Sequence, residues 1–107
     1  MQQNEKRMTC LPGSHVIATE FEDGGGVLIN LNSKKYIQLN KTAMLVWRCL
    51  ERELSPEDVT RELCSRYVVA IEHAQRSVTA TLDTFRRYGL LQENSQKSET
   101  RTIVERA

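Results

Sequence analysis

The sequence predicts an α+β domain in which a three-stranded antiparallel sheet is followed by three helices. Residues 27–31 and 36–39 are rich in branched and aromatic side chains, and the four-residue turn between them is short enough for a hairpin. A capped amphipathic segment begins directly after the second of these runs. Two more segments with helical spacing follow, without any further strand pattern.

The first strand is expected at residues 15–22, where apolar and polar side chains mix loosely enough for a strand with one wet face. Asp23 and three glycines then turn the chain. Within residues 27–31, Val27, Ile29 and Leu31 alternate with Leu28 and Asn30. This period of two predicts a meander with one consistently apolar face.

The first helix is predicted at about residues 41–53. Asn40 ends the preceding strand, and its side-chain oxygen can accept hydrogen bonds from the free amides of a helix that opens at Lys41. Strand and helix should therefore pack as one unit. Apolar side chains recur at helical spacing, and they predict a central helix: Ala43, Val46, Trp47, Leu50 and Leu54.

Two further helices are predicted from their start and stop signals. Ser55 can cap the second helix, Pro56 suits its first position, and the helix should end near Tyr67. After an apolar connector at residues 68–71, a third stripe runs to Gly89, a residue suited to a left-handed helix terminus. The stripe consists of Ala74, Val78, Leu82 and Phe85.

The order of elements is winged helix-turn-helix-like, with the sheet placed first. We expect a flexible lead-in at residues 1–14, one domain at 15–91 and a polar, mobile tail at 92–107. A net charge of +1 predicts no strong field for nucleic acid or an anionic membrane, and no apolar run approaches the roughly 20 residues of a membrane span. The first residues lack the apolar segment of a secretory signal, so a cytoplasmic protein is expected.

Catalytic and metal-binding patterns are weak. Cys10, Cys49 and Cys64 are scattered singly, which fits neither a disulfide framework nor a zinc site. A cysteine nucleophile would need His15 or His73 beside it, yet Cys49 and Cys64 fall within helix patterns that favour buried, inert thiols. We therefore expect no enzyme activity, no metal and no cofactor.

The arrangement resembles the PqqD family, whose members supply recognition elements for ribosomally made, post-translationally modified peptides. The resemblance covers about residues 15–91 and is carried by residues 26–31, 35–40 and 54–59, by Val46, Trp47 and Leu50, and by Leu82 through Leu91. Residues 36–40 followed by the Trp47 helix are most similar to the stand-alone leader-binding proteins of lasso-peptide pathways. Two positions depart from the family pattern: Ala43 replaces a frequent glycine, and Ser77 replaces a frequent acid.

The resemblance implies a non-catalytic protein that binds the leader of a precursor peptide as an added strand beside the third strand. Its partners would be that leader and a separately encoded leader peptidase or other modifying enzyme, with oligomeric state left open. The expected ladder uses the backbones of Tyr36, Ile37 and Gln38. The expected groove wall and rim comprise Val78, Thr81, Leu82, Phe85 and Arg86.

Two alternatives stay open at this stage. The stripe that contains Val78, Leu82 and Phe85 is also what a plain core helix would show. The chain could instead be a DNA-binding winged helix in which Arg76, Arg86 and Arg87 contact phosphates. Against that reading, the sheet precedes all three helices and the charge is nearly balanced.

Overall fold

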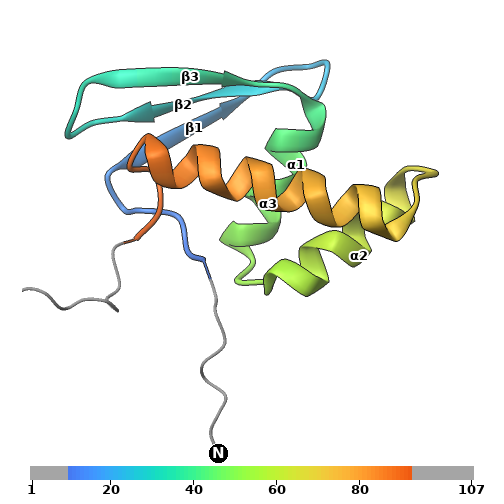
Figure 1. The fold of residues 1–107 in the computed structure, drawn as a ribbon. Helices are drawn as coiled ribbons and strands as arrows, with labels where there is room; N and C mark the ends of the chain where they lie inside the picture. The colour runs from blue at the N-terminus through green and yellow to red at the C-terminus, as the bar shows by residue number, and fades with distance from the viewer. Residues whose placement is uncertain (1–9, 93–107) are drawn as a thin grey trace, which may run out of the picture.

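A computed structural model describes residues 10–92 and contains one antiparallel sheet and three helices (Figure 1). The strands are β1 (Val16–Glu20), β2 (Gly26–Asn30) and β3 (Lys35–Leu39), and the sheet order is β1-β2-β3. The helices are α1 (Lys41–Glu51), α2 (Pro56–Arg66) and α3 (Ile71–Arg87). The predicted α+β class and element order are confirmed. None of the helices in residues 10–92 is long and apolar enough to cross a membrane.

The sheet covers the helices with the face that carries Gly26, Leu28 and Asn30, all of which are buried. Val27, Ile29 and Leu31 do share one face, but it points away from the helices, and Leu31 is 48% exposed. The sequence prediction failed to separate the two faces because β2 is apolar on both of them. The register aligns Ile29 with an isoleucine of β1 and with Tyr36 of β3, which forms an uncharged row across the outer face.

Side chains cap two helices as predicted. Asn40 accepts a hydrogen bond from the Ala43 amide, and Ser55 accepts one from the Asp58 amide. Helix α1 ends at Glu51, before the predicted residue 53, and Glu53 adopts the left-handed conformation at φ 64°. Helix α3 gives way to Gly89 at φ 67°, the left-handed terminus that the sequence predicted.

The core lies between the inner sheet face and the three helices. Trp47 of α1 and Phe85 of α3 meet edge to face, with ring centroids 5.2 Å apart and planes at 87°. Both rings are almost completely buried, and Leu28 of β2 joins them in the same cluster. Phe85 therefore contributes to the core.

The ordered unit begins earlier than residue 15. The Gly13 amide donates to the carbonyl of Leu90 at 2.9 Å, and the Gln92 amide donates to the carbonyl of Leu11 at 2.7 Å. Residues 11–13 thus pair with residues 90–92 and tie the two ends of the domain together. The remainder of the predicted lead-in and tail, residues 1–9 and 93–107, lies outside the described residues.

Candidate functional site: the β3 edge and the groove beside α3

A groove of about 280 Å³ runs between strand β3 and the C-terminal half of α3. It exists because α3 lies along the underside of the sheet while β3 is an outermost strand (Figure 1). The lining contains no lysine, arginine, aspartate or glutamate, so the groove suits an uncharged or apolar side chain. Its residues are Ile37, Gln38, Leu39, Asn40, Ala43, Thr81, Thr84, Phe85 and Tyr88.

The register of the sheet decides which backbone groups of β3 are free. The Leu31 amide donates to the His15 carbonyl at 2.9 Å, and the Phe21 amide donates to the Gly25 carbonyl at 2.7 Å. Since backbone groups point to alternate sides along an antiparallel strand, the even-numbered residues of β2 face β3. Their partners in β3 are Lys35, Ile37 and Leu39.

The amides and carbonyls of Tyr36 and Gln38 consequently point outward from the sheet edge, in the direction of an incoming strand. Both residues are exposed, and Tyr36 is 71% exposed. Ile37 was expected to offer its backbone as well, but its amide and carbonyl face β2. Its half-buried side chain lines the groove instead.

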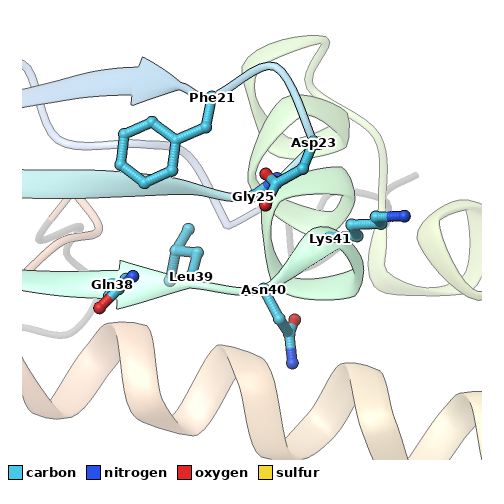
Figure 2. A pocket seen from close by; sticks show the side chains of 7 residues that line it. All are labelled: Phe21, Asp23, Gly25, Gln38, Leu39, Asn40 and Lys41. Atoms are coloured by element: carbon cyan, nitrogen blue, oxygen red, sulfur yellow. The ribbon is translucent and has the colours of Figure 1, made fainter.

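A second hollow of about 560 Å³ lies at the end of β3 (Figure 2). It is lined by the β1–β2 turn, through Phe21, Asp23 and Gly25, and by the first residue of α1, Lys41. It shares Gln38, Leu39 and Asn40 with the groove. The two hollows therefore meet along the last residues of β3.

Only some of the predicted peptide-binding residues line the groove. Ile37, Gln38, Thr81 and Phe85 line the groove. Tyr36 lies at the edge on the outer face, whereas Val78 and Leu82 are only 2% and 5% exposed and belong to the core.

Val78 contributes to a different cavity, between α2 and α3. Arg86 is outside the groove lining: its guanidinium pairs with Asp83 at 3.2 Å and donates to the Cys10 sulfur at 3.6 Å.

Several groove residues were absent from the sequence-based selection. Leu39 is buried in the core, and it also lines the groove. Thr84 and Tyr88 lie three and seven residues after Thr81, which places them on the same side of α3. Helical spacing from Thr81 could therefore have predicted Thr84 and Tyr88 as groove residues. They were missed because the prediction followed a stripe of apolar side chains, and both residues are polar.

The cysteines do not converge on this groove. Cys49 is fully buried in α1, and burial raises the pKa of its thiol, which keeps the sulfur protonated and unreactive at neutral pH. All three cysteines in residues 10–92 are free thiols, and no group of three metal-ligating side chains occurs in this part of the chain.

The family model described as "Coenzyme PQQ synthesis protein D (PqqD)" matches residues 25–91, which include β2, β3, all three helices and the groove. The chain belongs to the PqqD family. This PqqD-family member has no match among curated proteins.

Two solved structures are similar to this PqqD-family chain. The first is "TbiB1 in Complex with the TbiA(beta) Leader Peptide", with a TM-score of 0.73, 22% identity, and coverage of 79% of this chain and 98% of that one. The second is "Lasso peptide synthetase B1 complexed with the leader peptide", with a TM-score of 0.71, 28% identity, and coverage of 80% of this chain and 100% of that one. The first likeness, at its low identity, establishes a shared fold.

Proposed function

We propose that this chain binds the leader segment of a ribosomally synthesised precursor peptide as a fourth strand beside β3 and presents it to a separate processing enzyme. The observation that carries the proposal is the pair of outward-facing backbone positions, Tyr36 and Gln38, directly beside an uncharged groove. Both similar structures are described as leader-peptide complexes, which supports the same use of the fold. In this proposal the chain contributes binding and no catalytic step.

The geometry separates affinity from selectivity. An antiparallel strand paired with Tyr36 and Gln38 would exchange an amide and a carbonyl bond with each of them, irrespective of its side chains. Each such bond adds only about 0.5–1.5 kcal/mol net, while burial of one aliphatic or aromatic side chain adds about 1.5–3 kcal/mol. A short ladder with two or three anchors would therefore reach micromolar to nanomolar affinity after ordering costs.

Side chains of the bound leader would alternate between two environments. Those directly opposite Tyr36 and Gln38 would lie on the outer face of the sheet. Those in line with Ile37 would point into the groove, toward Thr81 and Phe85. The leader should therefore carry apolar residues two positions apart at its bound segment.

The processing enzyme is proposed to be a leader peptidase of a lasso-peptide pathway. The support is the structural similarity to the lasso peptide synthetase B1 and the resemblance of residues 36–40 to stand-alone leader-binding proteins. A precursor gene and a cysteine-protease-like gene beside this one would strengthen that assignment, whereas a radical-SAM gene would redirect it to another modification pathway.

Amide hydrogen exchange tests the proposal at single-residue resolution. The probe is a synthetic peptide that spans the leader of a short precursor gene, once such a gene is identified near this one, and it is added to the labelled protein. We expect the amides of Tyr36 and Gln38 to exchange quickly in the free protein and to become protected on binding. The Ile37 amide should be slow in both states because it already bonds β2. Binding without protection at Tyr36 and Gln38 would refute strand addition at β3.

A further inference from the structure

Asn30 is one of two buried polar residues in the described part of the chain, with 6% of its surface exposed. It uses both ends of its side-chain amide. Its Oδ1 accepts hydrogen bonds from the backbone amides of Asn32 at 2.9 Å and Ser33 at 3.2 Å. Its Nδ2 donates to the carbonyls of Tyr88 at 3.0 Å and Gly89 at 3.2 Å. All four bonds are made with backbone, so they depend on the position of the chain and not on neighbouring side chains.

These four bonds join the two walls of the groove. Asn32 and Ser33 lie in the turn that leads into β3, and the Asn30 carbonyl also accepts from the Lys34 amide at 2.8 Å. Tyr88 and Gly89 are the residues at which α3 ends. One side chain thus spans from the beginning of the edge strand to the end of the helix beside it.

Two neighbouring contacts reinforce the same connection. The His15 ring donates from Nε2 to the Gly89 carbonyl at 2.8 Å, which gives that oxygen a second partner. The structure also leaves no spare room at this point, since a Cβ atom on Gly89 would lie 3.3 Å from Asn30 Nδ2. The end of α3 is therefore held at close range by groups from the sheet and from the segment before β1.

We propose that Asn30 is a positioning residue for the peptide groove, because it sets the distance between β3 and the last turn of α3. This inference rests on the proposed function. Phe85 and Tyr88 form the helix side of the groove, and Asn30 holds the carbonyl of Tyr88 itself. If the end of α3 moved away from the sheet, the pocket for an inward-facing leader side chain would lose its shape while the free backbone of β3 stayed available.

Asn30→Asp separates the two ends of the side chain. The carboxylate can still accept from the turn amides, but it cannot donate to the helix carbonyls and its charge repels the negative end of the helix. We expect the affinity for the same synthetic leader peptide to fall about tenfold, mainly through faster dissociation. In the free variant, the amides of Tyr88, Gly89 and Leu90 should exchange faster, while those of Asn32 and Ser33 keep their protection.

Thr60→Val is the matched control. Thr60 is the other buried polar residue of residues 10–92, it donates to the Pro56 carbonyl at 2.9 Å, and it lies in α2 away from the groove. The Thr60→Val substitution should lower the melting temperature. It should leave peptide affinity unchanged at a temperature where Thr60→Val and Asn30→Asp are both folded. Equal affinity of Asn30→Asp and wild type under those conditions would overturn the proposal, as would an equal loss of affinity in Thr60→Val.

If Asn30→Asp does not fold, His15→Ala tests whether the contacts at the end of α3 position the groove. It removes an exposed bond to the same Gly89 carbonyl, and we expect about a twofold weaker affinity together with faster exchange at Gly89 and Leu90. Unchanged affinity and exchange would then overturn the positioning role. Failure of the proposed function looks different, because in that case the wild-type protein would not bind the leader peptide at all.

Discussion

The two halves of α3 form two hollows of different size and different chemistry. The N-terminal half lies on α2 beside a cavity of about 540 Å³, and the C-terminal half lies beside β3 at the groove of about 280 Å³. The larger hollow is bounded by two helices, whose backbone groups are already bonded internally. The smaller one adjoins a strand whose outward amides and carbonyls have no backbone partner within residues 10–92. The available backbone, and not the volume, therefore favours the C-terminal half as the proposed peptide site.

Charge distinguishes the two hollows as well. The α2–α3 cavity includes Glu57 and Arg61, and the Arg61 guanidinium pairs with Asp58 at 2.6 Å. Within α2, Arg66 also pairs with Glu62 at 3.5 Å. The helix pair that would read DNA in a winged helix thus neutralises part of its positive charge internally, and this weakens any attraction to phosphates.

The largest effect should come from proline at the free edge. Gln38→Pro removes an outward amide and places a ring where the incoming strand would bond, so leader affinity should fall at least about thirtyfold. The fold should survive, since that amide is not used within the sheet. Fluorescence anisotropy with the labelled leader peptide measures the loss.

Ala18→Pro provides the control on the opposite edge. By the same alternation, the Ala18 amide points away from β2, so proline there also spares the sheet ladder. Its affinity for the leader should stay within about twofold of wild type, below the effect of a single lost hydrogen bond. A similar loss of leader affinity in Gln38→Pro and Ala18→Pro, with both proteins still folded, would mean that the leader does not bind specifically at the β3 edge.

A charge in each hollow should have the next largest effect. Thr81→Lys places an ammonium group beside the uncharged groove, and we expect about a tenfold loss of leader affinity because an apolar anchor would then share its pocket with a charge. Thr79→Lys makes the same change two residues earlier on α3, in the α2–α3 cavity. Isothermal titration calorimetry should find that Thr79→Lys binds the leader peptide with unchanged affinity. A stronger loss in Thr79→Lys would move the site to the other half of the helix.

A smaller effect is expected from the helix caps. Asn40→Ala and Ser55→Ala each remove one side-chain cap and should each lower the free energy of unfolding by about 1 kcal/mol. Only Asn40 borders the groove, so only its replacement should also weaken leader binding, by about two- to threefold. Urea titration measures the first quantity and anisotropy the second. Equal binding by both variants would remove Asn40 from the site.

The smallest effect is expected with duplex DNA. Mixed-sequence DNA at low salt should bind no more tightly than about 100 μM, and added salt should abolish that binding, since few phosphates can be neutralised. Electrophoretic mobility shifts at two salt concentrations measure it. Tight, salt-resistant binding would restore the alternative of a DNA-binding winged helix.

The sequence was most informative where one residue carries the signal. Asn40, Ser55 and Gly89 each mark a helix boundary through local chemistry, and all three predictions hold in the structure. Residue spacing was less informative on β2, whose two faces are both apolar. The pattern there established a strand but could not tell which side the helices would cover.

The groove was only partly predictable for a similar reason. The free backbone positions of β3 depend on the pairing of β1 with β2, which is a long-range property that β3's own sequence does not contain. The α3 stripe was visible, but Val78 and Leu82 turned inward while Thr84 and Tyr88 came to line the groove. A short polar side chain at a groove rim has the same sequence signature as one in solvent.

The alternating direction of the backbone along β3 has a consequence for the precursor. A leader displaced by two residues would form the same backbone bonds with Tyr36 and Gln38, so the ladder alone cannot determine where along its length the peptide is held. That choice is left to the inward-facing side chains and the shape of the groove. Under the proposed function, precursor genes should tolerate substitutions at every second codon of the bound segment, whereas the intervening codons would determine which part of the leader is bound.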